Sequence, residues 1–250
     1  MCLKSTAILL LSHLSHTPII EEYRKLSRAA GDSAVTYLLL HAKADDPIEE
    51  ECKDRIHPFS SEDLKTLGYR SFDGSITPGS AHLPLLYFFS RHSDYDYYWL
   101  VEYDVRFSGD WRVFFDCFER NNSDFLSTHL RHYSEKREWP WWRNLNHPRI
   151  SIPLEERLRS FNPIYRISTS ALKYLHQSHR QGWCGHFEVL VPTLLYHGGF
   201  KLEDIGGDGM FTPPDRMNRF YREADTFRWR PVFSEVGLEM NKLYHPVKVH

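Results

Sequence analysis

The sequence predicts a single α/β domain in which a mostly parallel central sheet is flanked by helices. Short apolar runs rich in β-branched and aromatic residues alternate with helix-like stretches over the first 130 residues, an order typical of right-handed βαβ units. These runs are continuous, as expected of strands that are covered on both faces. A chain of 250 residues that is 41% hydrophobic also suits one domain with a real core.

The N-terminal half supplies most of the expected strands. We predict strands over residues 5–14, 33–42, 96–107 and 124–131, with an edge strand and a helical turn within 55–69. Helices are predicted over residues 17–31, 77–95 and 110–121. The first of these has Thr17 as its expected N-cap, Pro18 at the first helical position and Gly31 as its stop.

The pattern loosens in the second half of the chain. Residues 134–149 combine tryptophans, prolines and charges and are predicted to form a long loop. Helices are predicted over 167–183 and 186–199, with Pro192 interrupting the second. From Gly206 onward no periodicity is visible, so we expect an irregular C-terminal half within the same single domain, residues 1–250.

Charge and cysteine content narrow the classes of function. The net charge is −2 with histidine neutral, so no overall field favours a nucleic-acid partner. The four cysteines form no C-x-x-C pair and are interpreted as reduced thiols. The apolar run at residues 7–11 is too short for a signal sequence or a membrane span. These observations together predict a cytoplasmic protein.

The stretch "YYWLVEYDVRF" places two acids in an otherwise apolar strand. Residues two apart on a strand point to the same face, so Glu102 and Asp104 are expected to project together. Burying two unpaired carboxylates in an apolar setting costs roughly several kcal/mol of folding free energy, unless a cation lies nearby. Mg²⁺ or Mn²⁺ bound to a diphosphate needs only one or two protein carboxylates. The alternative is that Glu102 faces an arginine and Asp104 caps the next turn.

This order of elements resembles the nucleotide-sugar glycosyltransferases of the Rossmann-like GT-A fold, in which a short acid-x-Asp motif ends the fourth strand. "WLVEYDVRF" is similar to that motif, with Glu102 in place of the commoner first Asp. The resemblance implies that residues 5–130, approximately, form a nucleotide-sugar-binding half and that residues 131–250 form an acceptor-binding half. It also implies that Glu102 and Asp104 hold Mn²⁺ or Mg²⁺ against the donor diphosphate.

Further donor-binding residues follow from the same resemblance. Family members often carry an acid just past the second strand that reads the nucleotide base, and Asp45 and Asp46 lie there; a solvated acidic loop is the alternative. Gly79, Ser80 and His82 begin the helix before the motif strand. Backbone N–H groups at such a position favour a phosphate or a sugar hydroxyl, although a plain helix start needs no function.

Two positions in the second half resemble catalytic and metal-binding residues of the family. Glu188 is similar to the acid that acts as general base in inverting members, although the usual Glu-Asp pair is replaced by Phe187-Glu188. A carboxylate that stabilises a helix N-terminus is the alternative. His245, in "LYHPVK", resembles the C-terminal histidine that returns to the metal, and Lys248 could reach the diphosphate. A surface histidine in a frayed tail is the alternative for His245.

The aromatic loop "REWPWWR" suits carbohydrate, because sugar C–H faces stack on indole rings. Trp139, Trp141 and Trp142 are therefore predicted to bind the acceptor. The same loop could contact a membrane surface peripherally, since Trp among basic residues sits well at lipid headgroups. Packing onto the domain is the third interpretation.

The predicted function is metal-dependent transfer of a sugar from a nucleotide-diphosphate donor, with UDP favoured as the commonest family nucleotide, to a hydroxyl of a carbohydrate or glycoconjugate acceptor. One alternative is a nucleotidyltransferase on a related sheet, which should carry a Gly- and Lys/Arg-rich loop after the first strand. The corresponding loop here, "SHLSHTP", has neither Gly nor Lys. The other alternative is a non-catalytic carbohydrate-binding protein of the same fold.

Overall fold

The structure is a computed structural model that describes residues 4–41, 54–70 and 79–248. Its first half contains the following elements: β1 (Thr6–Ser12), α1 (Thr17–Ala30), β2 (Ala34–His41), β3 (Ile56–Phe59), α2 (Ser61–Lys65), α3 (Leu83–Phe89), β4 (Tyr97–Glu102), β5 (Arg106–Phe107), α4 (Trp111–Asp116) and β6 (Phe125–His132). The second half contains the 3-10 turns η2 (Tyr133–Glu135), η3 (Pro140–Arg143), η4 (Leu154–Glu156) and η5 (Pro214–Arg216). Around them lie β7 (Leu145–Asn146), β8 (Leu158–Ser168), α5 (Thr169–Gln181), β9 (Cys184–Gly185), α6 (Phe187–His197), β10 (Leu202–Asp204) and β11 (Leu243–Tyr244).

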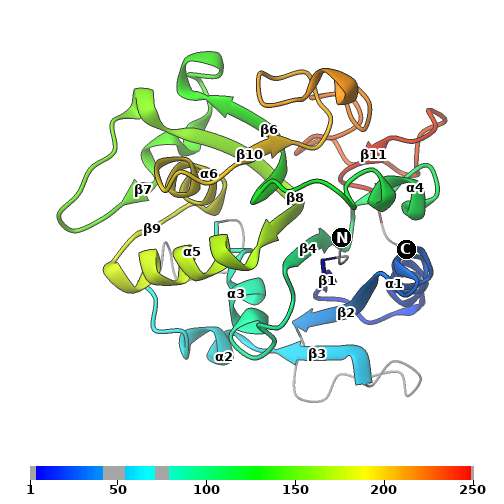
Figure 1. The fold of residues 1–250 in the computed structure, drawn as a ribbon. Helices are drawn as coiled ribbons and strands as arrows, with labels where there is room; N and C mark the ends of the chain where they lie inside the picture. Colours follow the sequence, from blue (N-terminus) through cyan, green and yellow to red (C-terminus); the bar gives the residue numbers. More distant parts are fainter. Residues whose placement is uncertain (1–3, 42–53, 71–78, 249–250) are drawn as a thin grey trace.

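The predicted α/β architecture with a mostly parallel sheet is confirmed. Seven strands form one sheet in the order β10-β6-β8-β4-β1-β2-β3. The pairs β1–β2, β1–β4, β2–β3 and β10–β6 are parallel, and only β8 runs antiparallel to its neighbours β4 and β6. Two further two-stranded pairings, β5–β11 and β7–β9, lie outside this sheet (Figure 1).

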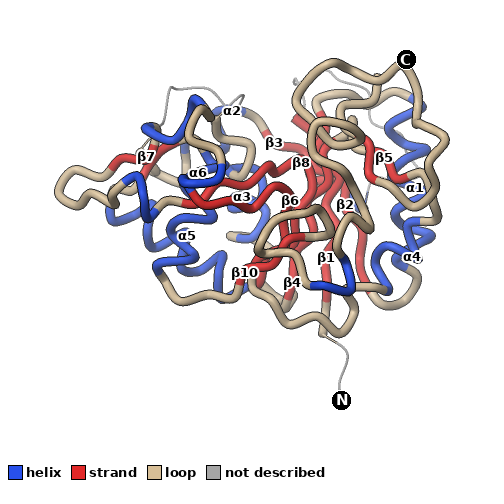
Figure 2. Tube along the Cα trace, turned by 90° about the horizontal axis from the view of Figure 1, so that it is seen from above, coloured by secondary structure: helices blue, strands red, loops and turns tan. Residues whose placement is uncertain are grey.

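Both faces of the sheet are covered by helices, which explains the apolar runs of β1, β2 and β4. Alternate residues of β1 belong to different cores: Ala7 and Leu9 to one, Ile8 and Leu10 to the other. The first core contains side chains of α2, α3, α5 and α6, and the second contains side chains of α1 and α4. Figure 2 shows the strands between these two groups of helices. Burial on both faces is the usual condition of parallel strands.

Several predicted boundaries need correction. Helix α1 is N-capped by His16 and not by Thr17, while Gly31 ends it as predicted with a φ of 52°. The helical turn α2 is capped by a reciprocal pair of hydrogen bonds between Ser60 and Asp63. Helix α3 begins only at Leu83, and the strand expected over 96–107 stops at Glu102.

The largest omission is β8, an eleven-residue strand that lies between β4 and β6 in the middle of the sheet. The predicted loop over 134–149 is built from 3-10 turns and the short strand β7. Beyond Asp204 the described chain is irregular, as expected, apart from η5 and β11. No helix within the described ranges is both long and apolar enough to cross a bilayer.

Candidate active site

The two acids of the motif lie at the carboxyl end of β4. Glu102 is the last residue of the strand, and Asp104 sits in the turn that follows, closed by a hydrogen bond from the Val105 N–H to the Glu102 carbonyl (3.0 Å). The turn, and not the two-residue repeat of a strand, therefore positions Asp104. This end of parallel strands is where open α/β sheets bind ligands. Neither acid pairs with an arginine among the described residues, so the alternative interpretation of the motif is not supported.

The C-terminal segment brings His245 to this turn. Strand β11 pairs antiparallel with β5, directly after the motif, and the Val247 N–H donates to the Asp104 carbonyl (2.9 Å). His245 follows β11 and is 3% exposed. The histidine is therefore held by backbone pairing and is not part of a frayed tail.

One ligand atom from each of Glu102, Asp104 and His245 can be chosen so that all three lie within 4.8 Å of one another. Oδ1 of Asp104 is buried without a hydrogen-bond partner and lies 3.5 Å from Nε2 of His245. Nδ1 of His245 is 2.8 Å from the Arg228 carbonyl, which can only accept, so Nδ1 carries the proton in the neutral ring.

The electrostatics of this group fit a cation. Burial lowers the pKa of His245 despite the neighbouring Asp104 carboxylate, so the ring is neutral and Nε2 presents a lone pair. Burial, and then the charges of Asp104 and Glu188, raise the pKa of Glu102 well above its usual range. Carboxylate oxygens and a neutral imidazole whose second nitrogen bonds a carbonyl form the donor set of many divalent metal sites. A bound cation would stabilise the ionised form of Glu102.

Glu188 lies in the first turn of α6, whose N-cap is His186. Its Oε1 accepts from the Asn162 N–H (3.4 Å), and its Oε2 lies 3.9 Å from Nδ1 of His186. Burial raises the pKa of Glu188 to about 7, although Arg159 and the Asn162 N–H act in the opposite direction. A carboxylate with a pKa near neutrality is suited to accept a proton under physiological conditions.

The three tryptophans of the aromatic loop have different surroundings. The Trp141 ring stacks on His186, with 4.8 Å between centroids and 10° between planes. The Trp139 ring lies edge-on to His186 at 6.0 Å. Trp142 is 2% exposed, and its indole N–H donates to the Lys136 carbonyl, so it packs in the core and presents no open face to a ligand.

Arg159, on β8, was not predicted as a site residue. It is 7% exposed, its Nε has no hydrogen-bond partner, and its guanidinium carbon lies 5.1 Å from the centre of the Trp139 ring. Its charge acts on Glu188 and on Glu223. Because it lies on the strand that sequence patterns did not reveal, its position beside Glu188 could not be anticipated.

His129 is a second unpredicted residue close to the site. It has a φ of 51°, unusual for a residue other than glycine, at an irregularity in the pairing of β6 with β8. Its buried Nε2 has no hydrogen-bond partner, and burial, followed by the charges of Arg159, Arg131 and His245, lowers its pKa well below the usual value. Strained backbone and an unpaired buried nitrogen are common features of functional sites.

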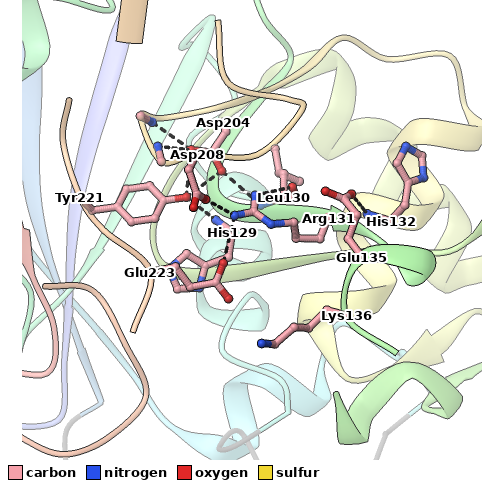
Figure 3. A network of polar contacts seen from close by, with 12 residues as sticks. His129, Leu130, Arg131, His132, Glu135, Lys136, Asp204, Asp208, Tyr221 and Glu223 are labelled. Atoms are coloured by element: carbon pink, nitrogen blue, oxygen red, sulfur yellow. Dashed lines mark hydrogen bonds and ion pairs between the residues drawn. The ribbon is translucent and has the colours of Figure 1, made fainter. Parts of the chain in front are cut away.

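A polar network fixes this part of β6 (Figure 3). The His129 N–H donates to the Tyr221 hydroxyl (2.7 Å), and that hydroxyl donates to the fully buried carboxylate of Asp204. Asp204 also accepts from the N–H groups of Leu130, Gly206 and Gly207. Arg131 forms ion pairs with Asp208 and Glu223. The strained residue is thus bonded to a hydroxyl that is itself held by the buried Asp204 carboxylate.

The remaining predicted residues lie around this centre with different contacts. The Gly79 carbonyl accepts from the Phe187 N–H (2.9 Å), so the segment that carries Gly79 and Ser80 contacts the start of α6. His82 is buried, and its Nε2 lies 2.9 Å from Nε2 of His179, within the helical layer.

Lys248 is exposed, one residue beyond the pairing of Val247 with Asp104. Asp45 and Asp46 lie outside the described residues.

Comparison with known proteins gave a family match and structural likenesses. A family model described as "Protein of unknown function (DUF3405)" matches residues 42–124, which include the motif at β4. No curated protein matched the sequence.

Similar solved structures include the galactosyltransferase LgtC in complex with donor and acceptor sugar analogues (TM-score 0.41, 11% identity, covering 87% of this chain and 76% of that chain). A glycosyltransferase involved in glycosylation of the major capsid of PBCV-1 has a TM-score of 0.34 and 9% identity, covering 69% of this chain and 64% of that chain.

A third similar structure is described as a glucose-1-phosphate thymidylyltransferase of Bacillus anthracis in complex with sucrose (TM-score 0.43, 11% identity, covering 80% of this chain and 86% of that chain). At these TM-scores the likeness is partial, and functional conclusions depend on this chain's own residues.

Proposed function

We propose that the protein is a divalent-metal-dependent glycosyltransferase that moves a sugar from a nucleotide-diphosphate donor, with UDP favoured, to an acceptor hydroxyl. One observation carries this proposal: three potential ligand atoms, one each from Glu102, Asp104 and His245, lie within 4.8 Å of one another at the carboxyl end of β4. The unpartnered Oδ1 of Asp104 and the lone pair of His245 Nε2 face each other there.

Glu102, Asp104 and His245 would hold Mn²⁺ or Mg²⁺. When bound, the ion would offset negative charge on the diphosphate leaving group. Lys248 is exposed near the same turn and would add a positive charge for the diphosphate. Asp45, Asp46, Gly79, Ser80 and His82 remain proposed contacts to the base, the phosphates or the sugar of the donor.

Glu188 would act as the general base that takes the proton from the acceptor hydroxyl as that oxygen attacks the anomeric carbon. Its pKa of about 7 supports this role. Its charge also raises the pKa of Glu102, which supports the proposal that the base and the metal ligands belong to one site. Trp139 and Trp141, next to His186 at the start of α6, would contact the acceptor sugar. Arg159 would position Glu188 or bond a substrate hydroxyl beside Trp139.

The proposal is tested by measuring the melting temperature of the full chain with UDP, GDP, ADP and dTDP, each with Mn²⁺ and with EDTA. A ligand that binds only the folded state raises the melting temperature. We expect a rise with at least one nucleotide, only when Mn²⁺ is present. Stabilisation that is identical in EDTA, or none with any nucleotide, would refute metal-dependent donor binding.

A further inference from the structure

A cavity of about 290 Å³ is lined by residues of the segment 143–154 and by Arg157. Two of its lining residues are arginines, Arg143 and Arg157, and none of the described residues that line it is acidic. Leu145 and Ile150 line the cavity with apolar side chains, and Asn146 lines it with an amide group. This volume is at the lower end of the range for small-molecule sites and suits a ligand of about one sugar ring.

Arg157 is held rigidly in the wall of this cavity. It is 8% exposed, and its guanidinium donates from Nε to the Ile152 carbonyl (2.9 Å) and from Nη1 to the Trp142 carbonyl. Nη2 makes no hydrogen bond to any described residue, and no ion pair of Arg157 is found within the described ranges. A buried guanidinium whose charge meets only carbonyl dipoles still has a donor available for an anion.

Arg143 adds a second positive charge that no described acid neutralises. It is exposed at the end of η3, and its charge, after burial, contributes to lowering the pKa of Arg157. Two arginines that repel each other across a cavity are stabilised when an anion enters between them. Planar guanidinium groups bind carboxylate, sulfate and phosphate through paired hydrogen bonds.

The part of the cavity wall formed by His147 and Ile150 is fixed in position. Nδ1 of His147 accepts from the N–H groups of Arg149 and Ile150 (3.1 and 3.0 Å). Its Nε2 therefore carries the proton and donates to the Gln181 carbonyl at the end of α5 (3.0 Å). Both ring nitrogens are thus bonded to backbone groups, so the ring shapes the cavity without competing for the anion.

The cavity adjoins the proposed acceptor side of the active site. The Asn144 carbonyl, next to Arg143, accepts from the His186 N–H (2.8 Å), and Trp141 stacks on the His186 ring. His186 caps the helix that carries Glu188. The segment from Trp141 to Leu145 therefore contacts the start of α6 through Trp141 and Asn144, and lines the cavity with Arg143 and Leu145.

We propose that this cavity binds an anionic group, carboxylate, sulfate or phosphate, carried by the acceptor carbohydrate, so that the protein acts on acidic glycans. The identification of the bound carbohydrate as an acceptor rests on the proposed transferase function. The binding of acidic sugars itself does not depend on the metal.

The test is calorimetric titration of the full chain in EDTA with glucuronate, glucose 6-phosphate, inorganic phosphate and neutral glucose. We expect Kd values on the order of 1 mM for the two acidic sugars and binding at least about tenfold weaker for glucose, because glucose lacks the charge-assisted bonds. Arg143→Glu should weaken binding of the acidic sugars at least about tenfold, and Arg143→Lys should restore most of it.

Arg149→Glu is the matched control, because Arg149 lies on the same loop but does not line the cavity; its affinities should stay within about twofold of the wild type. Equal binding of glucose and glucuronate, an Arg143→Glu variant that binds as the wild type does, or an equal loss in Arg149→Glu would overturn the proposal. Binding of inorganic phosphate alone, without the acidic sugars, would also overturn it.

A failure of this inference is distinguishable from a failure of the proposed function. If the Mn²⁺-dependent nucleotide effect is absent while acidic sugars bind through Arg143, the transferase proposal fails and the anion site stands. If the nucleotide effect is present while acidic sugars do not bind, only the anion site fails.

Discussion

Oδ1 of Asp104 and Nε2 of His245 face each other across 3.5 Å without a hydrogen bond between them. Both atoms are acceptors when the histidine is neutral with its proton on Nδ1, as its bond to the Arg228 carbonyl requires. Such an arrangement is unfavourable by itself and becomes favourable with a cation between the two atoms.

Asp104→Asn should abolish Mn²⁺-dependent nucleotide binding and turnover. The melting temperature of the ligand-free protein should stay within about 3 °C of the wild type, because the substitution removes a charge that repels Glu102 and breaks no side-chain hydrogen bond. Calorimetry with Mn²⁺ and a nucleoside diphosphate, together with a thermal melt, measures both effects. Asp116→Asn, at a largely exposed carboxylate on α4, is the control and should bind normally. Unchanged metal-dependent affinity in Asp104→Asn would eliminate its role as a ligand.

Glu188→Gln should keep nucleotide binding within about twofold but lower kcat by about 10²–10⁴-fold, since the amide cannot accept the proton of the acceptor hydroxyl. Binding is measured by calorimetry and turnover by release of the nucleoside diphosphate. Glu155→Gln, at an exposed acid in η4, is a suitable control. Full activity in Glu188→Gln would show that the base lies elsewhere or that the reaction needs none.

The pH dependence of the rate should reflect Glu188. Burial raises its pKa to about 7, so roughly half of the side chain is protonated at pH 7 and cannot accept a proton. We therefore expect kcat/KM to fall about tenfold per pH unit below pH 7 and to level off above it. A profile measured at saturating Mn²⁺ checks this, with melts at each pH to exclude unfolding. A flat profile between about pH 6 and about pH 8 would contradict the assignment.

Tyr221→Phe should destabilise the protein by about 1–3 kcal/mol. The change leaves the buried His129 N–H without its acceptor and removes one donor from Asp204, whose backbone donors remain. Urea denaturation measures the free energy of unfolding. Tyr174→Phe is the control: its hydroxyl makes no hydrogen bond to a described residue, so the expected change is below about 0.5 kcal/mol. Equal stability of both variants would mean that the network in Figure 3 does not hold β6.

The apolar strands β1 and β2 were predictable from their sequence, whereas β8 was not. β1 and β2 consist mostly of aliphatic residues, because helices cover both their faces. β8 contains two arginines, an asparagine and a proline, yet all eleven residues are buried. Arg166, for example, is buried because it donates to the carbonyls of Phe118 and Asn121. These partners are distant in sequence, so a local pattern cannot reveal them.

The candidate site was predictable to a similar extent. The pairing of His245 with the motif acids could be proposed from a family resemblance, and the structure brings the three side chains together. The two-residue repeat of a strand was expected to bring Glu102 and Asp104 together. This was only partly right, because a turn after the strand positions Asp104. The position of Arg159 depends on β8, and that of His129 on an irregularity in the pairing of β6 with β8. Neither feature produces a periodic pattern of apolar residues in the sequence.

The ligand candidates come from two parts of the chain that are remote in sequence, the turn after β4 and the segment after β11. An unfolded polypeptide would hold no such arrangement, so any affinity of this centre for a divalent ion adds directly to the free energy of unfolding. Chelation would then expose the chain to proteases even at temperatures where the loaded protein persists. Under the proposed metal dependence, the cellular abundance of the protein would then follow the supply of the ion.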